Sequence, residues 1–168
     1  MRHRVAGRTL GRDTKHRKSL RRNLISELFR HGKIKTTEAK AKAVRGQAEK
    51  YITLARNRGD AERLLELVES DEAALRRALT PAQAERLLRL HEDDQVDDLE
   101  REARAIAVHA QRLVARDIHD REVLYRLFHE IAPRYVNRPG GYTRIVSIGP
   151  RKGDAANMVY LMLVEGED

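Results

Sequence analysis

Residues 20–37, LRRNLISELFRHGKIKTT, contain the change in residue spacing that decides the fold class. The apolar residues of the first half recur at the three- and four-residue spacing of one helix face, namely Leu20, Leu24, Ile25 and Leu28. Gly32 suits the end of that helix, because glycine adopts the left-handed conformation at no steric cost. Residues 33–36 then alternate charged side chains with apolar or β-branched ones, which predicts a short strand.

The segments on either side of this stretch extend the pattern. We expect the first helix to span about 14–31, with Asp13 or Thr14 as its N-cap. A second helix, capped by Thr36 or Thr37, is expected to run to about residue 58, because small and apolar residues recur along it at helical spacing. Gly59 is expected to end it.

The C-terminal part predicts two further main helices and two strands. A third helix is expected to end near Arg116, and a fourth to run from a cap at Asp120 to Pro133. Strands are expected at about 143–148 and 158–164, after a type II turn at Pro139-Gly140. The order α-β-α-α-α-β-β predicts an α+β fold with two layers, in which helices pack on a small mixed three-stranded sheet.

Charge is distributed very unevenly along the 168 residues, whose net charge is +8. Residues 1–58 contain 18 Lys/Arg against 4 Asp/Glu (net +14), residues 59–104 contain 7 against 14 (net −7), and residues 105–168 contain 9 against 8 (net +1). Nine of the cations lie in the first 22 residues, which contain a single acid, Asp13. A charge density of this kind indicates a polyanionic partner such as a nucleic acid.

These patterns divide the chain into an arm, a body and an insertion. Residues 1–13 are expected to form a flexible basic arm, since they contain too little apolar surface to fold alone. Residues 14–168 are expected to form a single α/β domain. Within it, an acidic helical insertion at about 60–107 is interpreted as two or three short helices, with caps at Ser70 and Thr80-Pro81 and a break at 92–94.

The sequence gives no support to an enzyme, a cofactor or a metal site. There is no cysteine, and no apolar run approaches the length of a membrane span. His3, His16 and His31 lie in the most cationic part of the chain, where a metal ion would be repelled. We interpret Asp117, His119 and Asp120 as an interhelix turn with Asp120 as an N-cap, rather than as an acid–base site.

One loop near the C-terminus has a different character. Residues 149–153, GPRKG, are basic and bounded by glycines, although they lack the length and the Lys-Ser/Thr ending of a P-loop. Glycines and two cations allow the backbone and side chains to approach an anion closely. Composition alone leaves two polyanions open, RNA and DNA, so a DNA-binding architectural protein of the nucleoid type is the alternative function.

Two long blocks of the sequence resemble a known family. The first comprises Met1–Arg4, Gly7–Arg12, His16-Arg17, Arg22–Leu24, Ile34–Thr37, Ala39–Lys42 and Ala48–Lys50, and the second comprises Ile131–Tyr135, Arg138–Ile145 and Gly149–Ala156. Together they resemble the bacterial large-subunit ribosomal protein seventeen, over about 1–58 and 108–164. Typical members of that family connect their second and third helices by a short turn where this chain has the acidic insertion.

The resemblance implies a structural component of the large (50S) ribosomal subunit in the cytoplasm. It implies binding to 23S ribosomal RNA near the exit tunnel, contact with protein thirty-two of that subunit, and neither membrane nor small-molecule substrate. The RNA-binding residues implied in the first block are Arg2, His3, Arg4, Arg8, Arg12, Lys15, His16, Arg17, Lys18, Arg21 and Arg22. Those implied in the second block are Arg138, Arg144, Arg151 and Lys152. The insertion, being acidic, is expected to project to solvent or to contact a basic protein.

Overall fold

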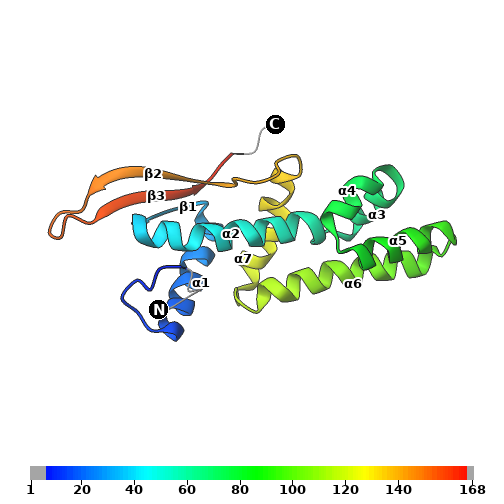
Figure 1. The fold of residues 1–168 in the computed structure, drawn as a ribbon, viewed down its shortest axis with the longest axis horizontal. Coiled ribbons are helices and arrows are strands. Elements are labelled where there is room, and N and C mark those ends of the chain that lie inside the picture. The colour runs from blue at the N-terminus through cyan, green and yellow to red at the C-terminus, as the bar shows by residue number, and fades with distance from the viewer. Residues whose placement is uncertain (1–6, 166–168) are drawn as a thin grey trace, which may run out of the picture.

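A computed structural model of the chain, which describes residues 7–165, shows an elongated α+β molecule (Figure 1). The α-helices are α1 (Thr14–His31), α2 (Glu38–Arg58), α3 (Ala61–Ser70), α4 (Glu72–Ala78), α5 (Pro81–Glu92), α6 (Val96–Ala115) and α7 (Arg121–Arg126). A π-helical turn (Leu127–Ile131) and a 3-10 turn (Pro133–Tyr135) follow α7. The strands are β1 (Lys33–Thr37), β2 (Thr143–Pro150) and β3 (Asn157–Leu163).

Local signals in the sequence account for the start of the fold. The Asp13 carboxylate accepts a hydrogen bond from the backbone N–H of His16 at 2.7 Å, which caps α1. Gly32 ends the helix in the left-handed conformation at φ 71°, with its N–H donating to the carbonyl of Leu28. Strand β1 begins at the next residue, so the predicted helix, glycine and strand are confirmed.

The sheet has the order β1-β3-β2, and both of its ladders are antiparallel. The expectation of three strands is therefore confirmed, whereas the expectation of a mixed sheet is wrong. A short hairpin joins β2 to β3 and makes that pair antiparallel. Strand β1 pairs with the other edge of β3 and so runs in the direction of β2, but β1 and β2 have β3 between them and never pair.

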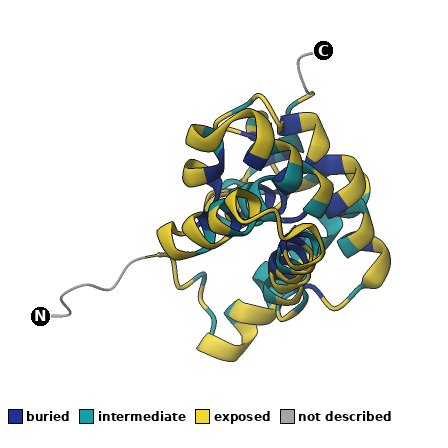
Figure 2. Ribbon diagram, turned by 90° about the vertical axis from the view of Figure 1, so that its right-hand side faces the viewer, coloured by how far each residue is buried: buried dark blue, intermediate teal, exposed yellow. Residues whose placement is uncertain are grey.

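The main core lies between the inner face of the sheet and the helices α1, α2, α6 and α7. Phe29 of α1, Ile52 of α2, Val114 of α6 and Leu161 of β3 are all fully buried in it. Figure 2 shows the same division of faces, with buried residues turned inward and exposed residues outward on each helix. Burial of this apolar face holds α1 in a fixed orientation on the body, and the opposite face of α1 therefore faces solvent.

The acidic insertion forms a second core of its own at the far end of the molecule from the hairpin (Figure 1). Leu64 of α3, Leu75 of α4 and Leu87 of α5 are buried there against the first half of α6. The expected short helices are confirmed as three, and so is the break at 92–94. Helix α6 runs unbroken from Val96 through both cores, so residue 107 lies inside it.

Three smaller expectations are wrong. Ser70 is the last residue of α3, and Asp71 is the residue that caps α4. The α-helical part of α7 ends at Arg126, and the chain continues through the π-helical turn before Pro133. Gly141, at φ 66°, takes the left-handed position that a type II turn would have placed at Gly140. None of the helices among residues 7–165 is long and apolar enough to cross a membrane.

Candidate nucleic-acid interface

The amphipathic pattern of α1 determines which of the predicted RNA-binding residues are presented together. Ile25, Leu28 and Phe29 point into the main core. Lys18, Arg21 and Arg22 lie on the same side of α1, one to two turns earlier, because they precede those residues by three, four or seven positions. Lys15, His16 and Lys18 are exposed, Arg12, Arg17, Arg21 and Arg22 are half-buried, and Arg8 is exposed in the segment before α1. Arg2, His3 and Arg4 lie outside the described residues.

Three of these cations line a groove of about 560 Å³ where α1 meets α2 and the C-terminal end of α6. Arg17, Lys18 and Arg21 come from α1, and Arg116 follows the last residue of α6. Arg116 was not among the residues expected to bind RNA, because it is about 95 positions from the others and no local motif surrounds it. Only the packing of α6 against α1 and α2 brings its charge to the cluster.

The same groove contains one carboxylate, Asp117, whose charge is compensated within the protein. Its Oδ1 accepts hydrogen bonds from Arg22 Nε at 3.2 Å and Nη2 at 3.0 Å, and its Oδ2 accepts one from the Tyr51 hydroxyl at 2.7 Å. Arg22 Nη2 also donates to the backbone carbonyl of Arg116 at 3.0 Å. Arg22, expected to bind RNA, is therefore occupied in joining α1 to the end of α6.

Protonation in this network follows from its geometry. Burial raises the pKa of Asp117, but hydrogen bonds from Tyr51 and Arg22 and the charges of Arg22 and Lys18 outweigh it, so the pKa lies below its ordinary value. Burial, together with the hydrogen bond to Asp117, raises the pKa of Tyr51 to about 12. At neutral pH the carboxylate is therefore ionised and the phenol is neutral.

The residues before α1 fold back toward this groove. Arg12 Nη1 donates to the carbonyl of Leu10 at 2.8 Å, and its Nε donates to His16 Nε2 at 3.2 Å. Gly7, at φ 94°, lies so close that a Cβ added there would be 3.5 Å from Arg21 Nη2. The Nε of Arg21 is buried and has no hydrogen-bond partner within residues 7–165.

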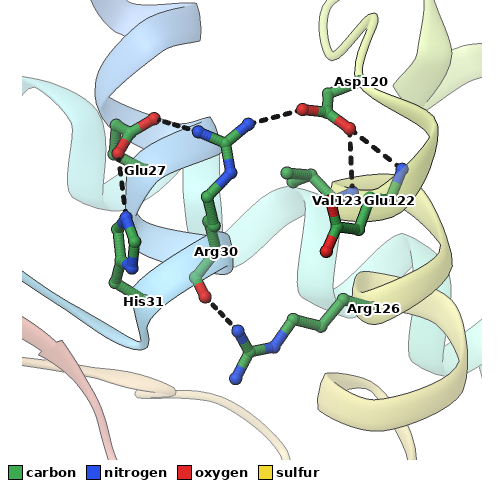
Figure 3. A network of polar contacts seen from close by, with 7 residues as sticks. All are labelled: Glu27, Arg30, His31, Asp120, Glu122, Val123 and Arg126. Carbon is green, nitrogen blue, oxygen red and sulfur yellow. Dashed lines mark hydrogen bonds and ion pairs between the residues drawn. The ribbon is translucent and has the colours of Figure 1, made fainter.

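A second polar network fixes the other end of α1 and explains Asp120 (Figure 3). The carboxylate of Asp120 caps α7 by accepting the N–H groups of Glu122 at 2.9 Å and Val123 at 3.4 Å, and it also accepts a hydrogen bond from Arg30 of α1. The backbone hydrogen bond from Val123 and the contact with Arg30 lower the pKa of Asp120. These backbone contacts confirm the predicted N-cap at Asp120. Asp117 and Asp120 thus both have structural partners within the protein.

The second set of predicted residues lies away from the α1 groove. Arg138 precedes β2 and donates to the carbonyl of Gly140, whereas Arg144 is exposed on β2. Arg151 and Lys152 are exposed in the loop of the β2–β3 hairpin. Arg151 Nε donates to Asp154 Oδ1 at 3.0 Å, and this contact lowers the pKa of Asp154 to about 2. The hairpin therefore presents a separate set of cations.

Comparisons with known proteins agree over almost the whole chain. The model of the family described as Ribosomal protein L17 matches residues 20–164. A protein of Pelobacter propionicus named large ribosomal subunit protein bL17 is 38% identical over 167 residues, which cover 99% of this chain and 94% of the relative. Proteins of the same name from Syntrophotalea carbinolica (36% over 167 residues; 99% and 77%) and Clostridium botulinum (38% over 157 residues; 94% and 96%) are similarly related.

Proposed function

The chain belongs to the family of ribosomal protein L17, a non-enzymatic structural component of the large ribosomal subunit, and we propose that it binds 23S ribosomal RNA through α1 and the N-terminal arm. The observation that carries this proposal is the groove in which Arg17, Lys18, Arg21 and Arg116 converge. Four cations around one groove, with its carboxylate already paired, form a surface complementary to phosphates.

The neighbouring cations extend this surface. Phosphate contact is proposed for Arg2, His3, Arg4, Arg8, Arg12, Lys15 and His16 in the arm and the first turn of α1. Arg22 supports the surface by holding α1 against α6 through Asp117. By neutralising phosphates that would otherwise repel one another, the arm and α1 would draw RNA segments together and so support assembly of the subunit.

The distribution of charge along the molecule sets its orientation on the RNA. Helices α3, α4 and α5 lie at the end of the molecule opposite the β2–β3 hairpin (Figure 1). Because residues 59–104 carry 14 acids against 7 bases, phosphates repel this end. We propose that it faces solvent or a basic protein, while α1 and the hairpin face RNA.

Two further contacts complete the proposal. The cations Arg138, Arg144, Arg151 and Lys152 before and along the hairpin are proposed as additional RNA contacts. Contact with protein thirty-two of the large subunit is also proposed, on the basis of the family resemblance. The comparisons give no support to the DNA-binding alternative.

The proposal is tested by measuring how salt weakens binding of the full-length protein to a 23S ribosomal RNA transcript. If the arm and α1 neutralise about six to nine phosphates, the logarithm of the affinity falls against the logarithm of the salt concentration with a slope of roughly −4 to −8. The variant Arg17→Gln/Lys18→Gln/Arg21→Gln should make this slope shallower by about 2 to 3. The matched variant Arg76→Gln/Arg77→Gln/Arg89→Gln, in the insertion, should leave it unchanged. A nearly flat slope for the unmodified protein would reject the proposal.

A further inference from the structure

The outer face of the three-stranded sheet is lined by side chains that the α1 groove does not use. Val159 and Leu161 of β3 point into the main core, so the alternate residues Met158, Tyr160 and Met162 point to the opposite face. These three side chains are only partly buried. The outer face of β3 therefore carries an apolar row that the protein itself does not fully cover.

The strand register surrounds this row with cations. Lys35 of β1 and Val146 of β2 flank Tyr160, and Lys33 of β1 and Arg144 of β2 flank Met162. Lys33, Lys35 and Arg144 are exposed, and Val146 is 41% exposed. Cross-strand neighbours on one face of an antiparallel sheet lie close enough for their side chains to act on the same ligand. The outer face thus combines one aromatic ring with three cations.

Charge on this face has a single sign. The strands β1, β2 and β3 contain Lys33, Lys35 and Arg144 and no Asp or Glu. Within the described part of the chain, none of these cations forms an ion pair with a carboxylate. The ammonium group of Lys33 lies 5.0 Å from the centre of the Tyr160 ring, so the ring already contacts a cation through its face.

We propose that this outer face is a second RNA-binding surface, on which Tyr160 stacks against an unpaired nucleobase while Lys33, Lys35 and Arg144 neutralise the adjacent phosphates. An aromatic ring between cations on an open sheet suits single-stranded RNA, because every base offers a flat face and every nucleotide a negative charge. An acidic protein segment could satisfy the charges but would leave the aromatic ring without a planar partner. This inference rests on the proposed RNA binding of the whole protein.

The test uses the full-length protein and a 12-nucleotide single-stranded oligoribonucleotide with one central 2-aminopurine. Fluorescence anisotropy gives the affinity, and quenching of 2-aminopurine reports stacking. Tyr160→Ala should weaken binding by about 5- to 100-fold and abolish the quenching. Tyr160→Phe, which keeps the ring, should retain both. Lys33→Gln/Lys35→Gln/Arg144→Gln should make the salt slope shallower by about 2, because each single-strand phosphate contact contributes about 0.7.

Two comparisons keep this test separate from that of the proposed function. If the sheet variants bind the oligoribonucleotide like the unmodified protein, while Arg17→Gln/Lys18→Gln/Arg21→Gln weakens binding, the sheet inference is wrong and the α1 interface stands. If neither set changes the affinity or its salt slope, both proposals fail. A third outcome would also overturn the inference: Tyr160→Ala binds RNA normally, but the variant protein is missing from purified large subunits. That result would assign the outer face to a protein partner. Circular dichroism confirms that each variant is folded.

Discussion

Arg22 and Asp117 lie 95 positions apart in the chain, yet their side chains form an ion pair of 3.0 Å that joins α1 to the end of α6. Their side chains are 26% and 15% exposed, so the pair is largely screened from water by the surrounding protein. This contact places Arg116 beside the cations of α1. The arrangement of the cations in the candidate interface therefore depends on the carboxylate of Asp117, which lies in the same groove.

Replacing Asp117 by Asn should destabilise the protein by about 1–3 kcal/mol, because Arg22 would keep its charge without an ionised partner. Urea unfolding followed by circular dichroism measures the change. Asp98→Asn is the matched control, since Asp98 pairs with Arg101 where both side chains are well exposed. That variant should change the free energy of unfolding by less than about 0.5 kcal/mol. Equal effects of the two variants would contradict the structural role of Asp117.

The contribution of Asp117 should also depend on pH in a defined direction. Its pKa in the folded protein lies below the ordinary value of 3.8, so its stabilisation is fully present above the unfolded-state pKa and is lost as the pH falls through the folded-state pKa. The difference in unfolding free energy between the unmodified protein and Asp117→Asn should stay constant between about pH 5 and 7. It should shrink below about pH 4, and a difference that grows on acidification would contradict this assignment.

Two glycines at the end and in the middle of α2 should respond in opposite ways to alanine. A Cβ at Gly59 would lie 2.3 Å from Phe128 Cδ1 and 2.4 Å from the carbonyl oxygen of Ala55, so Gly59→Ala should destabilise the protein by about 1–3 kcal/mol. Nothing lies within 4 Å of a Cβ at Gly46. Gly46→Ala should therefore stabilise the protein by about 0.5–1 kcal/mol. Thermal unfolding measures the change in stability of each variant. If both variants were stabilised, or both destabilised, the packing of Phe128 against Gly59 at the end of α2 would be contradicted.

Local signals explain why much of the fold could be predicted from the sequence. Asp13, Gly32 and Asp120 act within a few residues of their own position, and each ends or begins a helix where expected. The purely antiparallel sheet could not be predicted in the same way, because it depends on β1 pairing with β3 rather than with β2. Residue 107, where the insertion was expected to end, lies within α6, which keeps one helical pattern while its packing partners change.

The insertion should respond to mutation separately from the rest of the molecule. Leu87 is fully buried in the second core, so Leu87→Ala should cost about 2–5 kcal/mol there. Hydrogen exchange should accelerate in α3, α4 and α5 while β1 and β3 keep their protection. RNA affinity should be unchanged. Leu28→Ala, in the main core, is the control expected to accelerate exchange at α1 and the sheet, and uniform acceleration by both variants would show that the cores are one unit.

The candidate interface shows the same limit of sequence-based reasoning. The cations of α1 could be predicted because they lie close together in the chain. Arg116 and the row of Lys35, Tyr160 and Val146 could not, because their proximity results from helix packing and strand register. Arg22 was expected to contact RNA because the sequence shows its charge. The sequence does not show that Arg22 pairs with Asp117, which is 95 positions away.

The orientation of the protein on RNA is tested most directly by a density map of the intact large ribosomal subunit that contains this chain. We expect the groove of Arg17, Lys18, Arg21 and Arg116 to lie against phosphates of 23S ribosomal RNA. Helices α3, α4 and α5 should lie away from RNA, in solvent or against a basic protein. A map in which the α1 groove faces solvent while α3, α4 and α5 pack on RNA would contradict the account.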